Sequence, residues 1–176
     1  MPLFLTEISP SGDVDAVLAA VHTAVQSGGG EVIEVQVTAD KSQAFVIVEA
    51  QDSAKVAGAL GAASIAASEL APVRLVGADL EQVKATRPAS GYLVEWDIPA
   101  GITMDQYLAR KKEKSPLYAQ VPETTFQRTY VREDMMKCLC FYDAPDEAAV
   151  VRAREVVSTP IDRLHKLDNS FVKSNE

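Results

Sequence analysis

The stretch Lys137-Cys-Leu-Cys-Phe-Tyr-Asp-Ala-Pro-Asp146, which leads into a helix-like run over residues 147–157, has an echo in the first half of the chain. There, Ala44-Phe-Val-Ile-Val-Glu-Ala-Gln-Asp52 leads into an alanine-rich run over residues 53–67. Each stretch is a short apolar strand that ends near an aspartate before a helix. The pattern indicates a divergent internal repeat, and a repeat decides the architecture before any single motif does.

Outward from these two stretches, both halves predict the same order of elements: strand, helix, strand, strand, helix, strand. In the first half the expected elements are strands 3–8, 32–38, 44–50 and 73–76, with helices 13–26 and 53–67. In the second half they are strands 92–97, 125–132, 137–143 and 161–167, with helices 104–114 and 145–157. Thr103 and Gln106 have the spacing of a capping box.

This order is that of the ferredoxin-like unit, an antiparallel sheet with both helices on one face. The sequence therefore predicts an α+β, tandem ferredoxin-like fold (βαββαβ twice). We expect a divergent first repeat over residues 1–77, a connector over 78–90 and a second repeat over 91–168. Residues 168–176 are expected to fray.

Each predicted sheet leaves one open face that needs a cover. The two sheets of one chain could cover each other as a sandwich or barrel with a cleft, or each could recruit another chain. A homodimer or an internal pseudo-dimer is therefore expected. In either case the open face is where a site is expected.

Composition limits the classes of partner. The chain has 176 residues, 47% hydrophobic and 24% charged, with a formal net charge of -8. An acidic chain is poorly suited to nucleic acid or to an anionic membrane, because Lys and Arg provide most contacts to phosphate. No stretch approaches the roughly 20 apolar residues that span a bilayer. We expect a cytoplasmic protein. Its two cysteines are separated by one residue on a predicted strand and are poorly placed for a structural disulfide, which fits a reducing compartment.

Three segments of the second half carry a family resemblance. They are Tyr92-Leu-Val-Glu-Trp-Asp-Ile-Pro99, the strand end Tyr130-Val131, and the stretch from Lys137 to Glu147. Over about residues 91–167 the chain resembles a small bacterial ferredoxin-like domain described as nickel-responsive or nickel-binding. The resemblance implies a small dimeric ferredoxin-like fold that binds nickel or another divalent transition metal.

Glu95 is the first candidate site residue, because it sits centrally in a predicted strand. A carboxylate inside a sheet is costly to desolvate unless it is paired. Arg128 is the natural partner within this half, and contact with a ligand or metal, or simple exposure, are the alternatives. The candidate ligand-binding residues are Glu95, Arg128, Tyr130, Tyr142 and Tyr118.

Cys138 and Cys140 share one face of their predicted strand, opposite Leu139 and Phe141. Because Leu139 and Phe141 form the better core pair, we expect the cysteines to face the open side. Three interpretations stay open for the cysteines: core filling, metal ligation, and redox or nucleophilic chemistry. If the strand order brings them together, Cys138, Cys140, His165 and Glu95 are the candidate ligands of a mixed nitrogen, sulfur and oxygen site.

The favoured function is therefore a small soluble protein that binds a ligand or a metal, with nickel as the candidate, on the open face or cleft of the second repeat. No catalytic residue is assigned, and enzymatic activity is not favoured. The alternatives are a small ferredoxin-like-barrel enzyme, of the isomerase or cofactor-poor oxygenase type, and a purely structural interaction module.

Overall fold

The computed structural model describes residues 1–171, and they form two compact units. The first unit contains residues 1–73 and 80–89 together with the chain from Leu167, and the second contains residues 74–79 and 90–166. Part of the tail that we expected to fray, Asn169–Phe171, forms a short 3-10 helix, η2. The rest of that tail, residues 172–176, lies outside the described residues.

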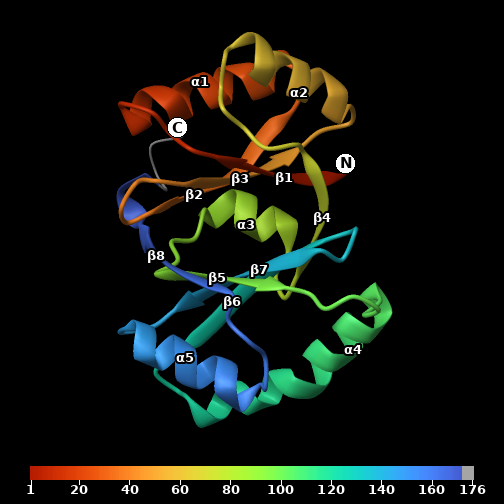
Figure 1. Ribbon diagram of the computed structural model, residues 1–176, viewed down its shortest axis with the longest axis vertical. Coiled ribbons are helices and arrows are strands. Elements are labelled where there is room, and N and C mark those ends of the chain that lie inside the picture. The colour runs from red at the N-terminus through yellow and green to blue at the C-terminus, as the bar shows by residue number, and fades with distance from the viewer. Residues whose placement is uncertain (172–176) are drawn as a thin grey trace. The chain divides into compact units, whose positions relative to one another are not determined.

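The first unit is a sheet with two helices along one face (Figure 1). Its elements are β1 (Leu3–Ile8), α1 (Val14–Ser27), β2 (Glu31–Thr38), β3 (Ala44–Glu49), α2 (Ser53–Ala62), the start of β4 (Ala71–Val76) and α3 (Leu80–Thr86). β3 pairs antiparallel with both β1 and β2. Asp13 and Asp52 cap α1 and α2 by accepting backbone N–H bonds, as the acceptor side chains preferred at N-caps do.

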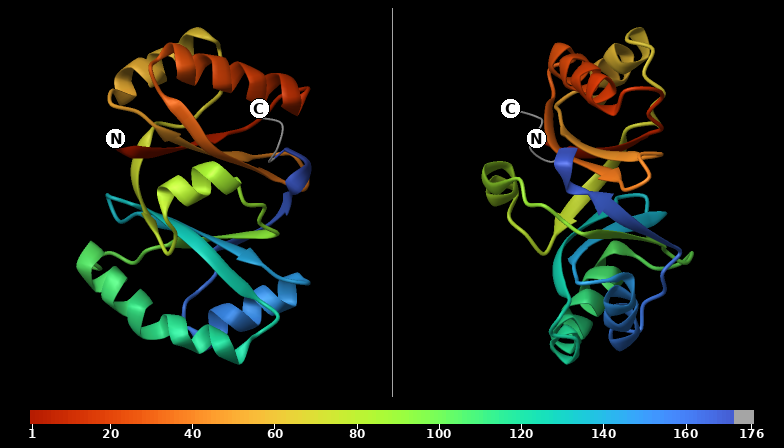
Figure 2. Two further views of the ribbon diagram at one scale, coloured as in Figure 1. Left: turned by 180° about the vertical axis from the view of Figure 1, so that it is seen from behind. Right: turned by 90° about the vertical axis from the view of Figure 1, so that its left-hand side faces the viewer.

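The second unit repeats this layout, with α4 and α5 along one face of its sheet (Figure 2). Its elements are β5 (Tyr92–Asp97), α4 (Met104–Lys114), the 3-10 helix η1 (Ser115–Gln120), β6 (Thr125–Arg132), β7 (Lys137–Asp143), α5 (Glu147–Val156) and most of β8 (Arg163–Asp168). The predicted capping box of Thr103 and Gln106 is confirmed at α4. Asp146 is the N-cap of α5.

The prediction of a tandem ferredoxin-like fold (βαββαβ twice), with antiparallel sheets and helices on one face, is wrong. The strand order β1-β3-β2-β8-β5-β7-β6-β4 closes into an eight-stranded barrel among the described residues. The physical reason lies in β4 and β8, each of which belongs partly to one unit and partly to the other. In β8, Leu167 and Asp168 pair with β2 whereas the residues from Arg163 to Lys166 pair with β5. Neither sheet therefore keeps the free edges of an isolated ferredoxin-like unit.

Within the described chain, no helix is long and apolar enough to cross a membrane.

Candidate functional site: a basic pocket in the second unit

The cysteines lie on the helix-covered face of the second sheet, not on an open face. Cys138 and Cys140 pack in a buried cluster with Val94, Trp96 and Tyr107. The register explains their placement, because Cys138 lies opposite Trp96 and Cys140 opposite Val94, and cross-strand partners share a face. Our expectation for the cysteines was wrong, since two helices cover the face that we took to be open.

Arg154 enters the same interior from α5. Its side chain is 4% exposed. Its Nη1 donates to the Tyr142 hydroxyl at 3.1 Å and lies 3.6 Å from Cys140 Sγ, and its Nη2 donates to the Pro160 carbonyl at 2.8 Å. Its Nε is buried and has no hydrogen-bond partner among the described residues. A buried guanidinium is therefore held by neutral oxygens and one sulfur, with one donor unused.

Tyr142 contacts both Arg154 and a group of aromatic rings. The hydroxyls of Tyr118 and Tyr142 lie 2.7 Å apart, and Phe126 stacks on Tyr118 with ring centroids 5.6 Å apart. Burial raises the pKa of both tyrosines, so their hydroxyls stay protonated and can donate. The structure thus brings together two of the predicted ligand-binding residues, Tyr118 and Tyr142.

A bulge explains why Phe126 and Arg128 separate. The pairing register of β6 with β7 shifts between these two residues, so Phe126 lies opposite Tyr142 and Arg128 opposite Phe141. A bulge inserts one extra residue and reverses the alternation beyond it. Arg128 therefore lies over the Phe141 ring, 4.7 Å from its centroid, and is not part of the interior that contains Phe126. Simple alternation over 126–132 could not reveal this.

The interior opens into a pocket of about 30 Å³, which we call the basic pocket. Four cationic side chains line it, and the described lining contains no carboxylate; the lining residues are Trp96, Tyr107, Arg110, Lys111, Lys114, Ser115, Tyr118, Arg154, Val157 and Thr159. Arg110 donates to the Ser158 carbonyl and lies over the Trp96 ring. Lys111 lies 3.9 Å from the centre of the Phe126 ring, and burial lowers its pKa.

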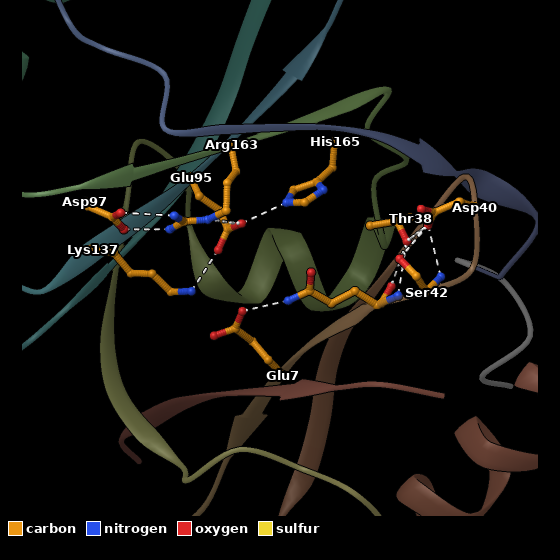
Figure 3. Close-up of polar contacts among 10 residues, drawn as sticks. Glu7, Thr38, Asp40, Ser42, Glu95, Asp97, Lys137, Arg163 and His165 are labelled. Carbon is orange, nitrogen blue, oxygen red and sulfur yellow. Dashed lines mark hydrogen bonds and ion pairs between the residues drawn. The ribbon is translucent and has the colours of Figure 1, made fainter. Parts of the chain in front are cut away.

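Glu95 lies on the opposite face of β5 and forms a separate charged cluster (Figure 3). Its carboxylate accepts hydrogen bonds from Lys137 Nζ and Arg163 Nε at 2.8 Å each, and it lies 2.8 Å from His165 Nε2. Burial would raise the pKa of Glu95, but the bonds to His165, Lys137 and Arg163 lower it from 4.5 to about 2. The partners of Glu95 are therefore these three residues and not the predicted Arg128. Arg163 also bridges to Asp97.

The candidate metal ligands consequently divide between two faces. Glu95 contacts His165 on one face, and Cys138 lies 3.8 Å from Cys140, sulfur to sulfur, on the other. Among residues 1–171, no three or more His, Cys, Asp or Glu side chains gather in a group that could hold a metal ion. The guanidinium beside Cys140 also opposes a dication there. The described donors therefore do not fit a nickel centre.

Tyr130 is the remaining candidate ligand-binding residue. Its ring is fully buried and packs edge-on against Phe141, with centroids 5.9 Å apart.

Arg154 and Lys111 are the functional candidates that sequence reasoning missed. A signal for Arg154 was present, because it lies four residues after Val150 and three before Val157, on the apolar stripe of its helix. A cation at a stripe position points into the interior.

Comparisons with known proteins bear mainly on the fold. The model of the SCO4226-like nickel responsive protein family matches residues 92–167, which is less than half of the chain. A search of curated protein sequences finds no match. The crystal structure of a candidate chlorite dismutase, TA0507, is similar over 98% of each chain, with a TM-score of 0.58 and 13% identity. A candidate monooxygenase from Fusobacterium nucleatum covers 94% of this chain and 90% of its own, at a TM-score of 0.42 and 10% identity. At such identities the chain shares with TA0507 the fold alone.

Proposed function

We propose that this protein binds a small anionic ligand in the basic pocket of its second unit. The observation that carries the proposal is the buried Arg154, whose Nε has no hydrogen-bond partner among the described residues and whose side chain lines the pocket together with three further cations. None of the four cations forms an ion pair with a carboxylate within residues 1–171. An anion would supply the missing counter-charge.

Energetics favour an anion over water as the occupant. A buried charge without a counter-ion costs several kcal/mol, on the order of that found when one partner of a buried pair is removed. A carboxylate or phosphate oxygen would accept a charge-assisted hydrogen bond from Nε, which is about twice as strong as a neutral one. The planar guanidinium matches these two groups in shape.

The lining also suggests how the ligand is oriented. Trp96, Tyr107 and Tyr118 provide apolar ring surface beside the cations. A volume of about 30 Å³ holds an acidic head group and little else, because one water already needs about 10–15 Å³ on the same measure. We therefore expect a small carboxylate or phosphate whose remaining atoms extend toward Lys114 at the pocket rim.

Native mass spectrometry tests the proposal on the protein as purified and after adding inorganic phosphate or benzoate as probes. The matched variants are Arg154→Leu in the pocket and Arg152→Leu on the exposed side of the same helix, where Arg152 pairs with Glu123 at 2.8 Å. An anion adduct present in the wild type and in Arg152→Leu, and lost in Arg154→Leu, is expected. Equal adducts in all three proteins, or no adduct in any, would overturn the proposal.

Nickel binding is the second candidate, and the family match over residues 92–167 favours it. Glu95 and His165 are the predicted ligands that lie in contact, so further donors would have to come from a second copy of the chain in the predicted homodimer. Added nickel should then give a stoichiometric adduct on a dimer that His165→Ala abolishes. The isomerase or oxygenase alternative stays a prediction, since fold similarity carries no chemistry.

A further inference from the structure

One lysine of the basic pocket has the surroundings of a reactive amine. Lys111 enters the pocket from α4, and its Nζ lies 3.9 Å from the centre of the Phe126 ring. We propose that this amine forms an imine with a short α-oxo acid, whose carboxylate is held by Arg154. The inference rests on the anion site proposed above, and it adds the class of ligand and a covalent step.

The Lys111 amine has no carboxylate beside it to hold it in the charged form. Within residues 1–171 its Nζ forms no ion pair and no hydrogen bond, and the described lining of the pocket contains no carboxylate. By contrast, Lys84 and Lys137 pair with carboxylates at 2.6 and 2.8 Å. An amine attacks a carbonyl only when it is neutral, so Lys111 is the better placed nucleophile.

Burial beside a second cation favours the neutral amine. Burial lowers the pKa of Lys111 and the charge of Arg154 lowers it further, whereas the two cysteines act in the opposite direction. Lysines that form Schiff bases are activated in the same two ways, by an apolar pocket or by a neighbouring cation. Arg154 itself stays charged, because a guanidinium does not lose its proton in proteins. The pocket therefore combines a fixed cation with a nucleophilic amine.

The same group of rings connects the amine to the guanidinium. Lys111 lies over Phe126, which packs edge-on to Tyr142 with ring centroids 5.8 Å apart. The Tyr142 hydroxyl in turn accepts a hydrogen bond from Arg154 Nη1.

The size of the basic pocket limits the ligand. Its volume is about 30 Å³, and since one water needs about 10–15 Å³ on this measure, the pocket admits a ligand about the size of two or three waters. A carbonyl that reaches Lys111 while the carboxylate contacts Arg154 must then be adjacent to that carboxylate. Glyoxylate and pyruvate are the smallest acids of this kind.

The chemistry balances without a co-reactant. The Lys111 nitrogen attacks the carbonyl carbon, so a C–N bond forms, the π bond of the carbonyl breaks, and one amine proton moves to the oxygen. The C–O bond of this carbinolamine then breaks as the nitrogen lone pair forms the C=N bond. The hydroxide leaves and takes the second amine proton as water. Addition of water reverses both steps and releases the acid.

Reductive trapping tests the proposal on the whole protein. Wild type is incubated with glyoxylate and sodium cyanoborohydride, which adds hydride to an imine and leaves a carboxymethyl group on the lysine. Peptide mass spectrometry then locates the label. Lys111 should gain at least about tenfold more label than the exposed Lys112, because a hydrogen bond to a charged group holds the acid at the pocket. Lys111→Arg should remove the fast label, and Lys112→Arg should not.

Acetaldehyde separates the amine from the anion site, because it has two carbons and a carbonyl like glyoxylate but no carboxylate. In wild type and in Arg152→Leu, the ratio of label on Lys111 to label on Lys112 should be about tenfold higher with glyoxylate than with acetaldehyde. Arg154→Leu should abolish this preference. Inorganic phosphate should protect Lys111 from glyoxylate.

Three outcomes would overturn the proposal: label that falls equally on Lys111, Lys112 and Lys114, the same total label in Lys111→Arg as in wild type, or a preference for glyoxylate that Arg154→Leu retains. The first outcome is measured on wild type and needs no variant, and circular dichroism detects any variant that fails to fold.

The imine and the anion site can fail separately. Binding of phosphate and benzoate to a protein whose Lys111 stays unlabelled would contradict the imine alone. Fast labelling of Lys111 by acetaldehyde, without binding of phosphate or benzoate, would contradict the anion site and with it the α-oxo acid as ligand.

Discussion

The interiors of the two units have the same layout and opposite chemistry. Eight residues after the N-caps Asp52 and Asp146 lie Leu60 and Arg154, which are 3% and 4% exposed. On the strand before each helix, the first unit has Ala44, Val46 and Val48 where the second has Cys138, Cys140 and Tyr142. The first unit shows that these positions can pack with aliphatic side chains alone. The polar version is therefore not required by packing, and it supports the proposal that the second interior binds an anion.

The first helix of each unit shows the same contrast. Eight residues after the N-caps Asp13 and Thr103 lie Val21, which is fully buried, and Lys111, which lines the basic pocket. Two cations thus enter one interior at positions that are aliphatic in the other. Because a cation in an interior is costly, each such position marks where an anion is expected.

The largest expected effect comes from giving the first unit the arginine of the second. Leu60→Arg should lower the free energy of unfolding by at least about 3 kcal/mol, because Val48, which packs in the same cluster as Leu60, cannot accept a hydrogen bond from a buried guanidinium as Tyr142 does. Urea denaturation measures this. Ala57→Arg, on the exposed side of the same helix, is the matched control and should change stability by less than about 0.5 kcal/mol. Equal stability of the two variants would contradict the claim that only the second interior accommodates a buried arginine.

A comparable effect is expected at Glu95, whose place in the first unit is taken by the partly exposed Glu7. The pKa of Glu95 is lowered from 4.5 to about 2, so the cluster contributes about 3 kcal/mol above pH 4.5 and loses it as the pH falls toward 2. Glu95→Gln should remove both this stability and its pH dependence. Denaturation at pH 7, 4 and 3 measures it. Glu7→Gln should leave the pH dependence in place, and a flat wild-type profile would contradict the account.

A smaller effect on stability, with a large one on binding, is expected for Arg154→Leu. Replacing a buried charge by an aliphatic side chain is often neutral or stabilising, so unfolding should change by less than about 2 kcal/mol. Binding of phosphate or benzoate should weaken by about 10- to 150-fold, the loss of a hydrogen bond to a charged group. Calorimetric titration measures the binding. Unfolding of the variant would mean that Arg154 is structural.

The smallest effect is expected for Tyr142→Phe, which gives the second unit an apolar ring where the first has Val48. The change removes the hydroxyl that contacts Tyr118 and Arg154. A loss of about 1 kcal/mol in stability is expected, together with weaker anion binding. Tyr92→Phe, on the same sheet, is the control. Thermal unfolding with and without phosphate distinguishes the two contributions.

Most helices and strands of both units followed from periodicity, and the capping box at Thr103 followed from spacing. The exceptions are α3, which lies in the predicted connector, and α2, which ends at Ala62 and not at residue 67. Closure of the barrel could not be predicted, because it depends on which distant strands pair with β4 and β8. A short apolar run indicates a strand but not its pairing partner. In the site, the β6 bulge reversed the alternation that places Phe126 and Arg128. Arg154 was missed because a charged residue on a helix is usually solvated, although its stripe position was visible.

Trp96 offers the most direct measurement, because it is the only tryptophan of the chain and lines the basic pocket. Its fluorescence can be followed while phosphate or benzoate is added at constant ionic strength to wild type, Arg154→Leu and Arg152→Leu. We predict a saturable change in wild type and Arg152→Leu that is absent in Arg154→Leu. The same curve in all three proteins, or no saturation in any, would contradict the claim that the second interior holds an anion.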